Sequence, residues 1–394
     1  MLVMQQMQSQ SRIGLMILLT FQLSLPILST DIYLPSLNDI SNFYHATHEQ
    51  VAHTLTAYFL IFGIVQLFYG PLSDRFGRRP MLLFSSVIYV MATLFCVFAT
   101  SIQMLIIARC LQALGAGSAI LTFAIIRDLY EGEYAAKMIA YMSAVVAMSP
   151  IIAPIVGGYI QVYLTWQLDF VILAIFEIVL LVLCYQFLPE TNQHAKRSGS
   201  LFTQSFKDYQ VLATNRYYLA HSLSAAGAFG ALFAYVSGAP YVLLNLMGYS
   251  AQAFSYLFAI ASSGYVVGAL VNGQLICRFG FNAVYRIGMT SLISGVIIMM
   301  LMCQLYPFCA AAIVVPQILC EFGIAIVVPI SITRALLPIP HHAGSGAALI
   351  GFLRFGFATM SSYLVTEFQG TTSLSLACVI FIFAMFSWYC LKIS

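Results

Sequence analysis

Long apolar runs alternate with short polar breaks along the whole chain. Because a helix needs roughly 20 mainly apolar residues to cross a bilayer, each run predicts one membrane-spanning helix. Charged or turn-forming residues separate the runs from one another. The twelve predicted spans are 13–36, 50–71, 80–99, 102–127, 137–161, 166–188, 215–240, 251–276, 283–303, 308–332, 343–367 and 371–391.

One long polar connection divides these spans into two sets of six. It covers residues 189–214 and is rich in Gln, Ser, Lys and Asn. The sequence therefore predicts an N-terminal six-helix bundle at 1–188, a cytoplasmic linker at 189–214 and a C-terminal six-helix bundle at 215–394. The fold class expected is an all-α membrane protein whose twelve transmembrane helices form two pseudo-symmetric bundles.

A repeated motif supports this division. GPLSDRFG at residues 70–77 follows the second span, and GQLICRFG at residues 273–280 follows the eighth. Gly, Leu, Arg, Phe and Gly coincide in the two copies. Repeated halves around a central site are typical of secondary transporters, in which one bundle rocks against the other.

The amino-acid composition excludes a soluble protein. Hydrophobic residues make up 61% of the chain and charged residues 7%, whereas soluble domains carry about 25% charged residues. A net charge of +3 provides no clustered basic face for nucleic acid. The expected partners are the lipid bilayer, a small-molecule substrate and protons, with no nucleic acid.

The positive charges orient the chain. Apart from Arg109 and Arg354, Lys and Arg occur only before span one, in alternate loops or at the span ends beside them, and at the end of the chain. Cytoplasmic loops retain such residues. Both termini are therefore expected in the cytoplasm, and compact loops without a removable signal peptide favour the inner membrane of a bacterium. The residues are Arg12, Arg75, Arg78, Arg79, Arg127, Lys137, Lys196, Arg197, Lys207, Arg216, Arg278, Arg286, Arg334 and Lys392.

The candidate charges at membrane depth are Asp31, Arg109, Glu177, Glu321 and Arg354. A charge costs about 2.5 to 3.5 kcal/mol at the helix centre and usually faces the bundle interior. Counting along the helices puts Asp31 and Arg109 at one level, and Glu321 and Arg354 near the midplane. Asp31 is the candidate proton acceptor, with Arg109 biasing its charge. The alternative is a structural ion pair between spans one and four, and the same alternative holds for Glu321 with Arg354. Glu177 lies near the midplane without an Arg partner at its level.

Several motifs resemble one family. GPLSDRFGRR at 70–79 resembles the signature between helices two and three of the major facilitator superfamily, RCLQALGAG at 109–117 agrees with it, and PIIAPIVGG at 150–158 looks like the antiporter motif of span five. With STDIYLP at 29–35 and RDLY at 127–130, the pattern is most similar to the bicyclomycin and chloramphenicol resistance branch of drug/proton antiporters. Ala153 stands where the antiporter motif usually has Gly, and Cys277 stands where the first repeat has Asp74.

The resemblance implies roles for particular residues. Gln112 lies in the motif at 109–117 and is added to the charged residues selected above by their depth. The expected proton and substrate pathway is then Asp31, Arg109, Gln112, Glu177, Glu321 and Arg354. The loop at residues 70–79 is expected to act as a cytoplasmic latch. Gly70 and Gly77 are expected to allow a tight turn, and Asp74 is expected at the start of the next helix. Two prolines are expected to kink span five, and two glycines to let it pack closely. The latch residues are Gly70, Asp74, Arg75, Gly77, Arg78 and Arg79, and those of span five are Pro150, Pro154, Gly157 and Gly158.

The function expected is export of small, largely apolar compounds in exchange for protons by alternating access. A metabolite or siderophore exporter of the same mechanism, or a proton symporter, remains the alternative. No constellation of nucleophile and base predicts an enzyme, and no cofactor is expected. His48 and His53 are one residue too far apart for a zinc-protease helix, so no metal is expected either. Tyr58, Tyr235 and Tyr265 are candidate pocket residues, and a monomer is the default for the fold.

Overall fold

The computed structural model describes residues 2–130, 132–192, 200–339 and 342–392. Within these ranges the chain is helical and contains no strand. The α-helices are α1 (Leu2–Asp31), α2 (Leu37–Tyr44), α3 (His48–Phe76), α4 (Arg78–Val97), α5 (Ile102–Ala116), α6 (Leu121–Leu129), α7 (Gly132–Val146), α8 (Ser149–Tyr163), α9 (Gln167–Phe187), α10 (Ser200–Thr214), α11 (Arg216–Pro240), α12 (Ala251–Leu305), α13 (Ala311–Leu336), α14 (Ala343–Glu367) and α15 (Leu374–Cys390).

Ten helical segments of the described chain are long and apolar enough to cross a membrane. One of them, α12, contains a non-helical residue at Gly280 and so holds two spans, and α15 is a shorter apolar helix. The predicted twelve-span, all-α membrane fold is confirmed.

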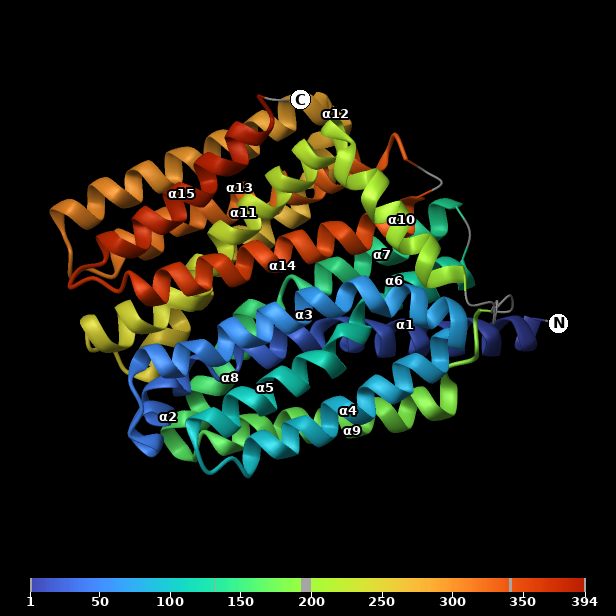
Figure 1. Ribbon diagram of the computed structural model, residues 1–394, viewed down its shortest axis with the longest axis horizontal. Coiled ribbons are helices and arrows are strands. Elements are labelled where there is room, and N and C mark those ends of the chain that lie inside the picture. Colours follow the sequence, from blue (N-terminus) through green and yellow to red (C-terminus); the bar gives the residue numbers. More distant parts are fainter. Residues whose placement is uncertain (1, 131, 193–199, 340–341, 393–394) are drawn as a thin grey trace.

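The helices form two groups that lie side by side (Figure 1). Helices α1 to α9 make up one group and α11 to α15 the other, with α10 beside both. We keep the predicted division into two six-helix bundles as a proposal, and we name the groups the N-half and the C-half. The ends of the helices near α10 are the linker end, and the opposite ends are the far end.

Three predicted spans are broken where the sequence predicted continuous helices. In span four, a 3-10 turn at Gly117–Ile120 separates α5 from α6. The first predicted span ends at residue 36, but α1 stops at Asp31, a 3-10 turn containing Pro35 follows, and α2 continues to Tyr44. In span five, α7 ends at Val146 and α8 begins at Ser149. Pro at the first turn of a helix loses no hydrogen bond. The expectation that Pro150 kinks a helix is therefore wrong, because Pro150 lies in the first turn of α8 and only Pro154 lies inside it.

The two halves touch mainly through α3 against α14 and α8 against α12. A Cβ added at Gly63 of α3 would lie 2.9 Å from the Cβ of Phe355 of α14, so these helices pack closely. Near the far end, Thr56 and Ser362 share a hydrogen bond of 2.8 Å, and an Asn245 amide lies 2.8 Å from the His48 ring. The halves are therefore joined from the middle of the molecule to its far end.

The linker end is hollow between the halves. A cavity of about 390 Å³ lies there, lined by α3, α6, α10 and the start of α14. Helix α10 is fastened to both halves beside it, since the Tyr209 hydroxyl donates to Leu67 O at 2.9 Å and Asp208 accepts from Ser345 at 3.0 Å. Burial raises the pKa of Tyr209 to about 12. The halves thus contact each other directly at the far end, whereas a cavity lies between them at the linker end.

Candidate functional site

Arg109 is the most deeply enclosed cation of the described chain. It lies on α5 with no exposed surface, and its guanidinium carbon is 4.5 Å from the ring centre of Tyr33, 4.4 Å from Tyr58 and 5.9 Å from Phe170. Aromatic faces attract a cation electrostatically, and more strongly when water is excluded. The three rings therefore form a cage for this guanidinium.

The hydrogen bonds of Arg109 leave part of its charge unmatched. One of its nitrogens donates to Ser29 O at 2.9 Å and to the Gln112 side chain, and Gln112 in turn donates to Thr93 at 2.8 Å. Nε and Nη2 of Arg109 have no hydrogen-bond partner in the described chain. A buried donor without a partner costs roughly 1–3 kcal/mol, so an acceptor placed beside these two nitrogens would be stabilising.

Asp31 does not form the ion pair with Arg109 that was the alternative to its role as proton acceptor. Its side chain is 4% exposed at the end of α1, and the hydrogen bond recorded for it comes from Thr30 at 2.9 Å. The ion pairs of the described residues do not join Asp31 to Arg109. Both groups are buried in the same half, but the guanidinium is directed into its aromatic cage.

The second predicted pairing is also not formed. Glu321 on α13 is buried and accepts from Gln317 at 3.4 Å. Arg354 on α14 instead places its guanidinium carbon 3.9 Å from the ring centre of Phe229. Glu321 thus bonds to a residue one turn earlier on its own helix, and Arg354 packs against a ring of α11. The described chain has no ion pair between Glu321 and Arg354.

Glu177 has a polar partner that the sequence did not indicate. It is fully buried on α9, and Gln22 of α1 donates to its Oε1 at 3.1 Å while also reaching Ser86 at 3.3 Å. The other carboxylate oxygen has no hydrogen-bond partner in the described part of the chain. This polar cluster ties α1 to α4 and α9.

The three candidate pocket tyrosines lie in different surroundings. Tyr58 belongs to the Arg109 cage, and Tyr235 is buried with a hydroxyl that has no partner among the described residues. Tyr265 packs against the apolar core and is partly buried. Sequence reasoning missed Asp169, which is fully buried on α9 and accepts from Ser36 at 2.7 Å. The sequence did contain a signal for Asp169, because this acid is the fourth residue of the apolar span predicted at 166–188.

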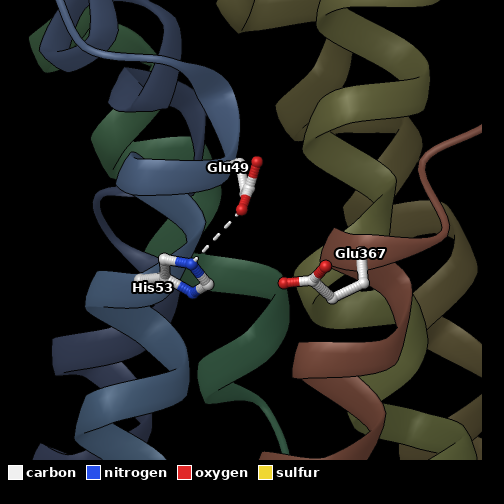
Figure 2. Close-up of side chains that lie close together, drawn as sticks. All are labelled: Glu49, His53 and Glu367. Carbon is white, nitrogen blue, oxygen red and sulfur yellow. Dashed lines mark ion pairs between the residues drawn. The ribbon is translucent and has the colours of Figure 1, made fainter.

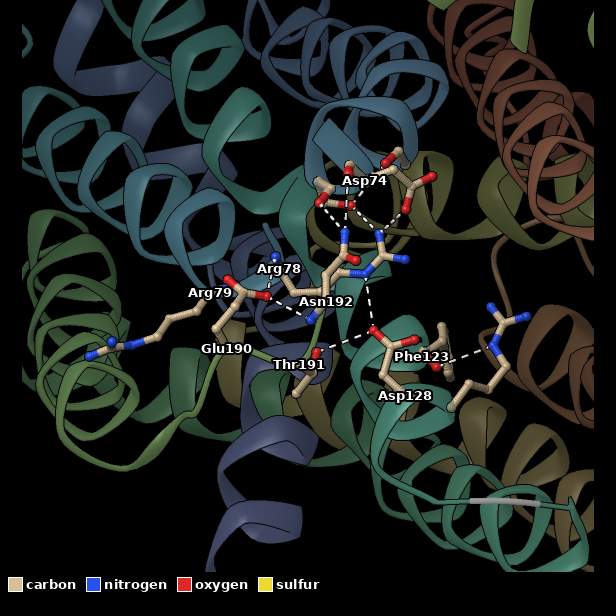
Figure 3. Close-up of polar contacts among 11 residues, drawn as sticks. Asp74, Arg78, Arg79, Phe123, Asp128, Glu190, Thr191 and Asn192 are labelled. Atoms are coloured by element: carbon tan, nitrogen blue, oxygen red, sulfur yellow. Dashed lines mark hydrogen bonds and ion pairs between the residues drawn. The ribbon is translucent and has the colours of Figure 1, made fainter. Parts of the chain in front are cut away.

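The loop between α3 and α4 forms a charged network (Figure 3). Arg78 lies 2.6 Å from Asp74 and 3.3 Å from Asp128, and it also contacts the Ser73 side chain. Asn192, which follows α9, donates to the backbone oxygens of Ser73 and Asp74 at 3.3 and 3.1 Å. The start of the linker is therefore part of this network.

The acid at the start of α4 is Glu190 and not Asp74. The prediction placed Asp74 there, but Asp74 lies in the last turn of α3. Glu190 accepts from the backbone N–H groups of Arg78 and Arg79 at 3.0 and 3.2 Å. These are free donors of a helix N-terminus, where negative charge is favourable. Glu190 thus caps α4 from more than a hundred residues away in sequence.

Of the two glycines expected to make the turn, Gly77 alone does so. Gly70 is helical, with open space around it, whereas Gly77 has φ 98° and ψ 153°. The second repeat has the same geometry, because Gly280 has φ 76° and ψ 162°. This backbone region is essentially restricted to glycine.

We expect Gly77→Ala to destabilise the protein more than Gly280→Ala, and Gly70→Ala not to destabilise it. Alanine at either turn carries backbone strain of about 1–3 kcal/mol. At Gly77 the new Cβ would also meet Glu190 Oε2 at 2.4 Å, whereas at Gly280 nothing lies within 4 Å. Thermal unfolding of the purified variants in detergent gives the order. Equal melting temperatures for the two turn variants would show that the Glu190 contact has no effect.

The two glycines of α8 face different partners. A Cβ at Gly157 would lie 1.7 Å from Ile32 O, within the N-half. A Cβ at Gly158 would lie 2.3 Å from Ser255 Oγ, on α12 of the C-half. Gly157 thus lets α8 pack against the break after α1, and Gly158 lets the two halves meet.

At the far end, Glu49 and His53 of α3 face Glu367 of α14 (Figure 2). The His53 Nε2 lies 3.8 Å from Glu49 Oε1, and single ligand atoms of the three residues lie within 4.8 Å of one another. The two glutamates are exposed. We assign these side chains to the contact between the halves, and the absence of a bound metal stays an expectation.

Comparison with known proteins places this arrangement in a family. Residues 19–363 match the family model of the Major Facilitator Superfamily. An uncharacterized MFS-type transporter, YdgK, of Bacillus subtilis is 30% identical over 95% of this chain and 94% of its own. A chloramphenicol resistance protein of Pseudomonas aeruginosa is 31% identical over 82% of this chain and 76% of its own, and a bicyclomycin resistance protein homolog of Haemophilus influenzae is 27% identical over 89% and 88%.

Solved structures show the same fold. A partially occluded inward-open structure of the xylose transporter XylE from Escherichia coli has a TM-score of 0.74 at 13% identity, covering 95% of this chain and 96% of that one. An inward-facing bacterial homolog of the human lysosomal transporter Spinster has a TM-score of 0.70 at 15% identity, with 97% of both chains covered. The expected resemblance to the bicyclomycin and chloramphenicol resistance branch is confirmed. This multi-pass membrane protein belongs to the Major Facilitator Superfamily, a family of transporters and not of enzymes.

Proposed function

We propose that the chain is a proton-coupled antiporter that exports small, largely apolar compounds across a bacterial inner membrane by alternating access. The observation that carries the proposal is a cavity between the halves at the linker end, opposite a closed far end. Such a molecule reaches one side of the membrane at a time. The names of the chloramphenicol and bicyclomycin resistance relatives support drugs as the substrate class.

In this proposal Asp31 takes up the proton and Arg109 binds an acceptor. Among the described residues Asp31 is buried without a cationic partner, and Arg109 keeps two unpaired donors in an aromatic cage. Intramembrane ionisable groups mark proton and substrate pathways. Gln112, Glu177, Glu321 and Arg354 remain candidates for the same pathway, at the positions described above.

We place the linker end in the cytoplasm. The positive charges outside the spans support this orientation, since cytoplasmic loops retain Lys and Arg. The open cavity then receives substrate from the cytoplasm, and rocking of the halves delivers it outside.

Proteoliposomes with an imposed pH gradient test the proposal. We expect chloramphenicol-like or bicyclomycin-like compounds to move against the direction of proton flow, with one pH unit driving about tenfold accumulation per proton exchanged. Siderophores in the same assay test the alternative exporter. Movement of substrate in the same direction as protons would establish symport, and transport indifferent to the gradient would refute proton coupling.

We expect Asp74→Ala to slow transport about two- to fivefold with expression retained. Asp74 lines the cavity opposite the first residues of α14, and we propose that closure of the linker end brings its charge to that helix N-terminus, an interaction of about 0.3–1 kcal/mol. Initial transport rates provide the measurement. Asp39→Ala is the matched control, because Asp39 is an exposed acid of the same half that contacts Gln161 near the far end. Equal transport rates for wild type and Asp74→Ala would exclude the proposed role of Asp74 as a latch.

A further inference from the structure

A second cavity lies inside the C-half and is separate from the one between the halves. It measures about 600 Å³, and α11, α12 beyond Gly280, α13 and α15 line it at the linker end. The two cavities have no lining residue in common. A transport pathway between the halves therefore does not account for it.

The cavity carries positive charge, and the described residues that line it provide no counter-ion. Arg286, Arg334 and Lys392 line it, and none of its lining residues is acidic. From residue 215 to the end, the sequence contains only two acids, Glu321 and Glu367. Glu321 lies deeper on α13, and Glu367 ends α14 at the far end. Neither acid is placed to neutralise the cations of the cavity.

The contacts recorded for two of these cations are with neutral groups. Arg334 donates to the Asn282 amide oxygen and lies 5.7 Å from the ring centre of Tyr285. The ammonium of Lys392 lies 3.9 Å from the ring centre of Trp388. These contacts hold the side chains in place but leave their charge uncompensated.

A buried polar side chain without a partner also indicates a ligand. His221 of α11 lines the cavity, is 3% exposed, and packs its ring 4.6 Å from that of Tyr217. Its Nδ1 has no hydrogen-bond partner in the described chain. Buried polar groups are nearly always hydrogen-bonded, so an unpaired one calls for an explanation. An anion in the cavity would accept a hydrogen bond from the imidazole.

The rim of the cavity is apolar. Phe281, Leu337 and Trp388 line it and are 44%, 77% and 36% exposed. Trp is typical of the membrane–water interface, where its ring sits at the level of the headgroups. A ligand with an anionic group and an attached hydrocarbon chain fits this combination better than a free anion does.

We propose that this cavity binds the phosphate group of an anionic phospholipid, held by Arg286, Arg334, Lys392 and His221, with the acyl chains against the apolar rim. Basic pockets between membrane helices are suited to such headgroups. Arg binds phosphate through two parallel hydrogen bonds and Lys binds it as a point charge. The site is independent of the transport direction proposed above.

Native mass spectrometry of the purified full-length protein tests the site. The probes are phosphatidylglycerol, phosphatidylcholine and inorganic phosphate, each titrated separately. We expect phosphatidylglycerol to bind wild type in preference to phosphatidylcholine, and the double variant Arg286→Gln with Arg334→Gln to weaken this binding on the order of tenfold. Arg286→Lys with Arg334→Lys should retain most of it.

Arg278→Gln is the matched control. Arg278 is an exposed cation two residues before the Gly280 turn of α12 that contacts the neighbouring Phe279 ring and does not line the cavity. Lys392→Gln offers a variant outside the packed interior in case the double variant does not fold. Equal phosphatidylglycerol affinity in wild type, Lys392→Gln and Arg278→Gln would overturn the site. Binding of inorganic phosphate without retention of phosphatidylglycerol would overturn the lipid as its ligand.

Discussion

Asp31→Asn is expected to abolish proton-driven accumulation of substrate while leaving the protein folded. The amide has nearly the shape of the carboxyl group, and its oxygen can still accept the hydrogen bond that Thr30 donates. What the variant loses is a group that binds and releases a proton. Because an imposed gradient of one pH unit supplies about tenfold accumulation per proton, accumulation should fall from that level to none.

Counterflow separates a loss of coupling from a loss of transport. With substrate on both sides and no pH gradient, Asp31→Asn should still exchange labelled substrate, since rocking of the halves requires no proton once the site is neutral. Two matched variants remove other buried carboxylates, Glu321→Gln on the opposite half and Asp169→Asn near the far end of α9. Full accumulation by Asp31→Asn would exclude it as the proton carrier. Loss in Glu321→Gln alone would move that role to the C-half.

Gly158→Ala is expected to push the molecule out of the conformation described here. The added methyl group would meet Ser255 Oγ at 2.3 Å and Ala251 O at 3.0 Å, both on α12 of the other half. Overpacking of this kind costs about 1–3 kcal/mol. Because the conflict exists only while the halves are joined at the far end, this cost falls on that state. The ratio of open to closed far ends should rise roughly five- to 150-fold.

Spin labels at positions 43 and 249 measure this shift. Phe43 and Tyr249 are exposed near the far end of the N-half and the C-half, so in a cysteine-free background their distance distribution reports the opening. Ser255→Gly, combined with Gly158→Ala, removes the conflicting side chain and should restore the closed distance. Gly157→Ala is the control within one half, where its conflict with Ile32 O should lower thermal stability without changing that distance. An unchanged distribution in Gly158→Ala would show that α8 and α12 absorb the methyl group.

The fold could be predicted from the sequence because its signals are local. Apolar runs long enough to span a bilayer define the helices, and the repeated motif places Gly77 and Gly280 at corresponding turns whose backbone angles agree. The breaks inside spans one and five were harder to predict. Pro35 and Pro150 mark them, but a proline in an apolar run is consistent with a kink, a break or the first turn of a new helix.

The partners of the buried charges could not be predicted, because depth along a helix does not fix the direction in which a side chain points. Asp31 and Arg109 were placed at one level, yet the guanidinium is directed toward Tyr33, Tyr58 and Phe170. Aromatic residues are frequent in this chain, so no spacing distinguishes three that form a cage. Tertiary packing alone decides such a contact.

The contact of Glu190 with α4 could not be predicted either, because the two segments are far apart in the sequence. Glu190 lies in a segment that reads as polar linker, and nothing in its neighbourhood relates it to the first turn of α4. The resemblance to the family directed attention to Asp74, which belongs to the same network but ends the preceding helix.

The contacts made by residues 190–192 also decide where a fragment of the N-half should end. A fragment cut at the predicted boundary after 188 would lack the carboxylate that caps α4 and the amide of Asn192 that binds the last turn of α3. In such a fragment the end of α3 and the start of α4 would lose these hydrogen bonds, beside Arg78 and Arg79. A fragment intended to reproduce the N-half should therefore extend through Asn192, and a gene split between the two halves should leave residues 190–192 with the first.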